Sequence, residues 1–138
     1  MAAVQRFEDL RVWQMAHTLC VEIFKLSERF GRDYRFLSQI TSAAGSIMDN
    51  IAEGFERDGR KEFVQFLFFA KGSCGEVRSQ LIRAFDFGYI SESEFEHLRT
   101  EAEQLSSSIF GLIKYLRNAN YSGTKYKSFD DPDKKSND

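Results

Sequence analysis

Few residues in this sequence could carry covalent chemistry, and the most conspicuous is Cys74 in the stretch FFAKGSCGEV, residues 68–77. A cysteine among glycine and serine is either a nucleophile in a reactive loop or a buried thiol in a helix. On a helical wheel Cys74 is in phase with Phe63, Leu67 and Leu81, so it points into the protein core. Because burial raises the pKa of a thiol and weakens it as a nucleophile, we predict a structural cysteine.

The other metal-ligating and catalytic residue types are sparse. Two histidines and two cysteines show no ligand pairs at zinc-finger spacing. His17 and Cys20 are three residues apart on one helix, which is weak evidence for a metal. Bundles that bind two metals use Glu-x-x-His pairs on facing helices, and Glu94 with His97 supplies one such pair. We therefore expect no catalytic residue, no metal and no cofactor.

The composition gives no sign of a strongly charged, secreted or membrane protein. The 138 residues are 29% charged with a net charge of −2, so no overall basic field attracts nucleic acid or membranes. Charged residues at 6, 8, 9 and 11 lie where a signal peptide would be apolar. The apolar stretches are much shorter than a membrane span. A cytoplasmic protein without disulfides is expected.

Apolar residues recur at helical spacing in four long segments, and the one proline, Pro132, follows all of them. Short connections between long helices force neighbours to run antiparallel, so we predict an all-α, up-down-up-down four-helix bundle over residues 1–118. The polar, turn-rich residues 119–138 predict a flexible tail. The first three segments are residues 9–30, 34–57 and 59–87, and the fourth ends near Arg117.

Polar residues and glycines mark the ends of these segments. Ser91 and Glu94 form an S-x-x-E capping box at the start of the fourth segment. Asp33 and Asp58 are the expected N-caps of the second and third. Gly31 is expected to stop the first.

Three residues near the end of the second segment flank its apolar stripe. We expect Asn50 or Glu53 to form an inter-helix hydrogen bond that fixes the orientation of the helices. Gly54 is expected to relieve crowding where the first helix crosses near Trp13.

The third segment is apolar on more than one side. Its core face is expected to hold Phe63, Phe66, Leu67, Ala70, Cys74, Val77, Leu81, Ala84 and Phe85. A second stripe lies away from that core, and its glycines each cost about 1 kcal/mol relative to alanine within a helix. Either this helix is central, flanked by the second and fourth, or its second face contacts another subunit. The second explanation is favoured. The interface candidates are Val64, Phe68, Gly72, Gly75 and Ile82.

Three stretches together carry a family resemblance. FEDLRVWQMAHTL (7–19), SAAGSIMDNIAEGFER (42–57) and KEFVQFLFFAKGSCGEV (61–77) contain F-x-x-L-x-V-W-Q, N-I-A-E-G and A-x-G-S-x-x-E in that order. Over residues 7–116 the chain resembles the bacterial 23S rRNA intervening-sequence proteins, also called the S23 ribosomal protein family. That four-helix bundle family includes the accessory variability determinant of diversity-generating retroelements.

The resemblance implies a homopentameric barrel of bundles, which in the retroelement branch binds nucleic acid and a reverse transcriptase. It transfers no catalytic residues. The retroelement members look strongly basic, whereas this chain has a pI of about 5.8.

The turn between the second and third segments shares one end of the bundle with the start of the first helix and the end of the fourth. Acidic residues such as Glu53 and Glu56 are interleaved with the basic ones there. The end is therefore either a mutually compensated, solvated surface or, if the cations gather on one rim of an oligomer, a phosphate-binding ring. The nucleic-acid candidates are Arg57, Arg60, Lys61, Arg11, Lys114 and Arg117.

These observations favour a non-enzymatic, oligomeric four-helix bundle scaffold that binds a macromolecular partner and no membrane. The partner classes are RNA or DNA, a reverse transcriptase, or another nucleic-acid-processing protein. The alternative is a small-ligand-binding or enzymatic bundle with a pocket in the bundle core or the oligomer pore.

Overall fold

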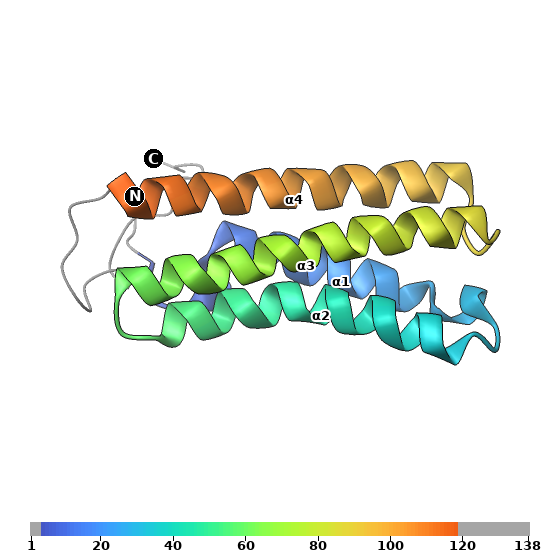
Figure 1. The fold of residues 1–138 in the computed structure, drawn as a ribbon, viewed down its shortest axis with the longest axis horizontal. Helices are drawn as coiled ribbons and strands as arrows, with labels where there is room; N and C mark the ends of the chain where they lie inside the picture. The colour runs from blue at the N-terminus through green and yellow to red at the C-terminus, as the bar shows by residue number, and fades with distance from the viewer. Residues whose placement is uncertain (1–3, 119–138) are drawn as a thin grey trace.

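The computed structural model describes residues 4–118, which form an antiparallel four-helix bundle (Figure 1). This confirms the predicted fold class, and no strand occurs within these residues. The predicted tail, residues 119–138, lies outside the described residues. The elements are the 3-10 helix η1 (Phe7–Asp9), α1 (Arg11–Lys25), the 3-10 helix η2 (Ser27–Phe30), α2 (Tyr34–Glu56), α3 (Arg60–Asp86) and α4 (Glu92–Asn118).

Each long helix packs against two neighbours around the bundle. α3 lies between α2 and α4, and α1 closes the bundle by packing on α2 and α4 (Figure 1). The α2–α3 turn therefore lies at the same end as the start of α1 and the end of α4. Within residues 4–118, no helix combines the length and apolar character needed to cross a membrane.

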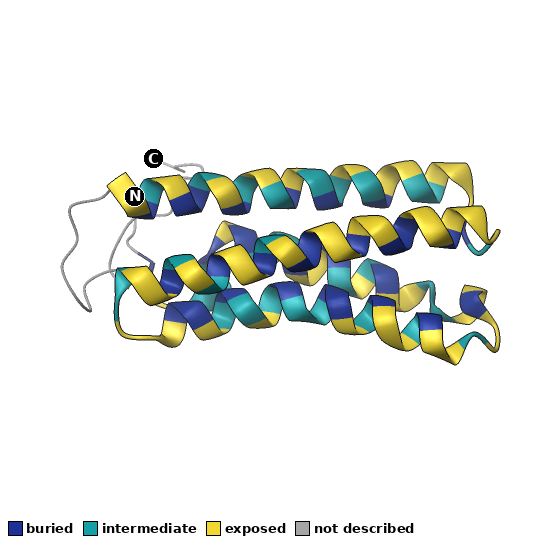
Figure 2. Ribbon diagram, viewed as in Figure 1, coloured by how far each residue is buried: buried dark blue, intermediate teal, exposed yellow. Residues whose placement is uncertain are grey.

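The core runs the length of the bundle, with buried residues on the facing sides of the helices and exposed residues outside (Figure 2). The apolar residues that recur at helical spacing in the fourth segment form a row along α4, which we call the α4 seam; it is buried from Leu98 to Leu116, with Phe95 partly buried at its start. On α3 the wheel is wrong for Phe85, which is 39% exposed and stacks on the Phe95 ring, with centroids 5.1 Å apart. The buried core residues of α3 are Phe63, Leu67, Ala70, Cys74, Val77, Leu81 and Ala84, and Phe66 is partly buried.

Two of the predicted helix caps are confirmed. Glu94 N donates to Ser91 Oγ at 3.1 Å, and Ser91 N donates to Glu94 Oε1 at 2.8 Å, which completes the capping box. Asp33 Oδ1 accepts from Phe36 N at 3.2 Å at the start of α2. Asp33 Oδ2 also accepts from the hydroxyl of Tyr89 at 2.6 Å, which fastens the α3–α4 connection to α2.

Two boundaries differ from the sequence prediction. Asp58 is not the N-cap of α3. That position is Gly59, whose φ of 124° is one that side-chain-bearing residues rarely adopt. The first helix ends at Lys25, and the chain then tightens into η2 before Gly31.

The polar residues near the end of α2 bond within that helix, so the expected inter-helix bond is wrong. Asn50 Nδ2 donates to the carbonyl of Ser46 at 2.8 Å and to its Oγ at 2.9 Å, and Glu53 pairs with Arg57. A hydrogen bond nearby that does join α2 to α3 runs between Ser46 Oγ and Ser73 Oγ, at 3.1 Å.

The reason expected for Gly54 is also wrong. A Cβ placed there would lie 2.6 Å from the Cβ of Phe66 and 3.1 Å from Cδ1 of Phe63, both on α3. The glycine makes room for α3 rather than for Trp13 on α1.

Candidate functional site

The outer side of α3 carries a continuous exposed row, which we call the α3 stripe: Phe68, Gly72, Gly75, Ser79 and Ile82. The spacing of four, three, four and three residues places all five on one side of the helix. Phe68 is 38% exposed and Ile82 is 50% exposed. A Cβ added at Gly72 or Gly75 would meet nothing within 4 Å among the described residues, so packing within residues 4–118 does not require either glycine.

One of the predicted interface residues belongs partly to the core. Val64 is half-buried and packs against the buried cluster, which removes it from the outer row. The predicted positions Phe68, Gly72, Gly75 and Ile82 do lie together on the surface.

Two of the predicted nucleic-acid residues lie beside this stripe, on the α3–α4 face. The Arg117 guanidinium carbon is 4.9 Å from the centroid of the Phe68 ring. Lys114 Nζ is 5.2 Å from the Phe110 ring centroid, and Lys71 Nζ is 5.7 Å from the same centroid. A cation over an exposed ring is held by about 0.5–1 kcal/mol, so these side chains keep their charge available to a partner.

The charges at the α2–α3 turn are partly compensated. Arg57 Nη2 lies 2.9 Å from Glu53 Oε1, and Arg57 Nη1 lies 3.9 Å from Glu62 Oε2. Its guanidinium also covers the Phe66 ring at 5.1 Å. Lys61 is exposed and Arg60 is the first residue of α3. The turn therefore brings three of the six predicted cations together, with acidic neighbours among them.

The sixth predicted cation lies elsewhere, in an open groove between α1 and α4. Arg11 lines this groove with Met15 from α1 and with polar residues of α4, around a volume of about 660 Å³. The α4 residues of the groove are Thr100, Glu103, Gln104, Ser107 and Ser108. A small polar ligand is the kind of molecule that such a groove could hold.

Cys74 lies where the wheel placed it. Its side chain has no exposed area, and burial raises the pKa of the thiol to about 12, with small opposing effects from Lys71 and Arg78. Cys20 is partly buried, and its pKa is raised by burial and then by the charge of Asp49. Neither thiol has the lowered pKa of a catalytic cysteine.

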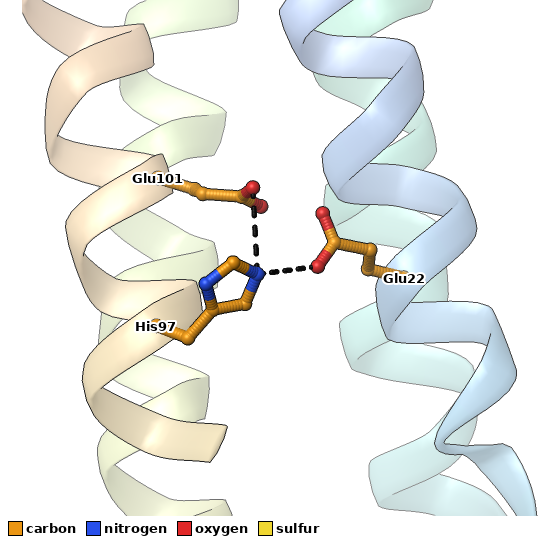
Figure 3. Close-up of side chains that lie close together, drawn as sticks. All are labelled: Glu22, His97 and Glu101. Carbon is orange, nitrogen blue, oxygen red and sulfur yellow. Dashed lines mark hydrogen bonds and ion pairs between the residues drawn. The ribbon is translucent and has the colours of Figure 1, made fainter. Parts of the chain in front are cut away.

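A cluster that the sequence analysis missed joins α1 to α4 at the opposite end from the α2–α3 turn. His97 Nε2 lies 2.6 Å from Glu22 Oε2 and 3.5 Å from Glu101 Oε1 (Figure 3). His97 and Glu101 are one helical turn apart, a spacing visible in the sequence. The approach of Glu22 depends on how α1 packs against α4, which the sequence does not reveal.

Comparisons with known proteins agree with this architecture. A crystal structure of a protein of unknown function from the S23 ribosomal protein family of Bacteroides thetaiotaomicron superposes with a TM-score of 0.69. It is 21% identical in sequence, and the match covers 75% of this chain and 98% of that one. No functionally curated protein matches the chain. The family model described as 23S rRNA-intervening sequence protein matches residues 8–111, most of the bundle, and the chain therefore belongs to that family.

Proposed function

We propose that this protein is a non-enzymatic scaffold that assembles with copies of itself through the α3 stripe and binds nucleic acid at its basic end. The observation that carries the assembly is the stripe itself. Two glycines in the middle of a long helix each cost about 1 kcal/mol, and a Cβ added at either would meet nothing within 4 Å among residues 4–118. Close approach by a helix of another copy would explain them.

The residues around the glycines fit such a contact. Phe68 and Ile82 stand at the two ends of the small-residue segment and expose apolar surface that no described part of the chain covers. A homopentamer is the assembly that the family resemblance implies. In such a ring, each subunit uses one face to contact a different face of the next subunit. The ring closes when the successive rotations between subunits add up to a full turn.

Light scattering on the purified full chain tests the assembly. Five chains of 16.0 kDa give a particle of about 80 kDa. Ile82→Glu is expected to shift the protein to smaller species, because it buries an unpaired charge in the contact. Phe68→Glu is a weaker test, because its carboxylate could pair with the Arg117 guanidinium now over that ring.

The control for this experiment is Phe24→Glu on α1, where the side chain is 67% exposed and far from the stripe in sequence. It is expected to leave the mass unchanged. A 16 kDa parent protein would rule out the assembly, and an unchanged mass for Ile82→Glu would rule out the stripe as its site.

Nucleic acid is the proposed partner because three cations gather where α3 begins. Arg57, Arg60 and Lys61 lie at the start of α3, the end of a helix where the dipole favours anions. The ion pairs of Arg57 are exposed, and such pairs contribute about 0–1 kcal/mol. A phosphate can therefore replace the carboxylates, and a closed oligomer would repeat the site around its axis.

Gel shifts with single-stranded and duplex RNA and DNA, run over a range of salt concentrations, test this partner. Replacing Arg57, Arg60 and Lys61 with alanine is expected to weaken binding and to flatten its salt dependence, because fewer counterions are released. The matched control replaces Lys25, Arg32 and Arg35, three exposed cations at the opposite end, and removes the same charge.

Equal losses from both triple variants would indicate attraction to overall charge rather than to this site. Absence of binding to every nucleic acid at about 50 mM salt would rule out the proposal.

A further inference from the structure

The Glu22, His97 and Glu101 side chains form a compact group of metal-ligand types. One ligand atom from each, two carboxylate oxygens and an imidazole nitrogen, lie within 4.8 Å of one another. Within residues 4–118 it is the one group of three such side chains with this geometry. Figure 3 shows Glu22 reaching from α1 toward the His97 ring, with Glu101 on the next turn of α4.

A second observation points to a missing positive charge. Glu101 Oε2 is buried and has no hydrogen-bond partner. One carboxylate oxygen of Glu22 lies within 4.8 Å of one of Glu101. Two carboxylates held this close repel each other when both are ionised, and a divalent cation between them would remove that cost.

The distances are compatible with an ion after a small adjustment. Ligand atoms about 2.1 Å from a tetrahedral ion stand about 3.4 Å apart. The 3.5 Å separation of His97 Nε2 from Glu101 Oε1 already matches this value, whereas the 2.6 Å separation from Glu22 Oε2 must widen by less than about 1 Å. The His97 side chain is 59% exposed, so its ring is free to make that movement.

The ligand set indicates which ions would bind. An imidazole nitrogen favours zinc and its first-row neighbours, whereas Mg²⁺ and Ca²⁺ prefer oxygen ligands alone. We propose that Glu22, His97 and Glu101 bind a divalent transition-metal ion of the zinc class, which cross-links α1 to α4. Three protein ligands leave a fourth position for water.

The ion would strengthen a contact between the α1 segment and α4 that ion pairs already join. Arg29, just beyond α1, forms a two-pronged pair with Glu94 at 2.8 and 3.1 Å, one turn before His97. Both contacts join the end of the α1 segment to the start of α4. If the cluster holds no metal, the same three side chains form an ion-pair network alone, and titration with Zn²⁺ separates the two possibilities.

Isothermal titration of the chelator-treated full chain with Zn²⁺ tests the proposal. One Zn²⁺ per chain is expected, with a dissociation constant in the micromolar range or tighter, and no heat from Mg²⁺. His97→Ala and Glu101→Gln are each expected to weaken Zn²⁺ binding by at least about tenfold. A loss of affinity of that size is typical even when the residue replaced merely hydrogen-bonds to a metal ligand. Zn²⁺ should also raise the melting temperature of the parent but not of Glu22→Gln.

The control is His17→Ala, which removes the other histidine of the chain, three residues before Cys20. This variant is expected to bind Zn²⁺ as the parent does. His97 and His17 are both exposed, so neither substitution should prevent folding, and far-ultraviolet circular dichroism checks this. The proposal fails if the parent does not bind Zn²⁺ at about 100 µM, a concentration well above that needed by protein zinc sites. It also fails if His97→Ala binds as the parent does.

Discussion

The inner and outer faces of α3 differ in what their residues meet. On the inner face Phe63, Leu67 and Cys74 have no exposed area and pack in the bundle core. On the outer face Phe68 and Ile82 are exposed and stand on either side of two glycines, at which an added Cβ would meet nothing within 4 Å among the described residues. Packing within the subunit accounts for the apolar residues of the inner face, whereas packing among the described residues does not account for the two glycines of the outer face.

Two glycines show the same difference at single positions. Gly54 on α2 faces the inner side of α3, where a Cβ would collide with Phe66. Gly75 lies on the outer side of α3, where a Cβ would enter open space. The first glycine is required by packing within the subunit. The second glycine lowers the stability of the helix, and no packing contact among the described residues requires it.

The largest effect is expected from Gly54→Ala. The atom it would strike is the Cβ of Phe66, at 2.6 Å, which is attached to the α3 backbone and cannot rotate away. The two helices must therefore separate locally, at a cost of about 1–3 kcal/mol. The gain in helix propensity, about 1 kcal/mol, offsets part of this cost. Urea denaturation at one fixed protein concentration should show a net loss of stability.

Gly45→Ala is the matched control, because it lies on the same helix and its added Cβ would meet nothing within 4 Å. It should leave stability unchanged or raise it. If Gly54→Ala proves as stable as Gly45→Ala, the close approach of α2 and α3 is wrong.

Periodicity predicted the helices well because one face of each is buried along its whole length. The α4 seam and its Ser91–Glu94 box are confirmed, since spacing and local hydrogen bonds decide both. The wheel misplaced Phe85, because it gives the direction of a side chain and not the width of the buried face near a helix end. The change from α1 to the 3-10 helix η2 does not interrupt the apolar spacing, so the sequence pattern did not predict it.

The candidate sites were predictable only in part. The exposed α3 stripe follows from the wheel, since residues 68, 72, 75 and 82 lie on one side of any regular helix. The His97–Glu101 spacing is equally local, but Glu22 is 75 residues from His97 in sequence. Their meeting depends on the register of two helices that are not consecutive. The ion pairs of Arg57 also depend on side-chain rotamers, which no sequence pattern specifies.

A smaller effect is expected on the inner face from Cys74→Ala, a core truncation that should cost about 1 kcal/mol and leave assembly unchanged. The thiol itself should be inert in the native protein. With a pKa of about 12, about one thiol in ten thousand is ionised at pH 8. A thiol reagent should label Cys20 first and Cys74 only on unfolding. Rapid labelling of native Cys74 would contradict its burial.

The smallest expected change in stability, and the sharpest test of the outer face, comes from Gly75→Ala. Within one subunit the substitution meets open space and should stabilise α3 by about 0.5–1 kcal/mol through helix propensity. If another copy packs against the α3 stripe, the added methyl group should hold the two helices apart and weaken association. Sedimentation over a dilution series should then show Gly75→Ala dissociating at higher concentration than the parent, while Gly45→Ala dissociates as the parent does. A variant that gains stability and assembles unchanged would show that the stripe faces solvent, because close packing by a helix of another copy is the reason proposed for the glycine.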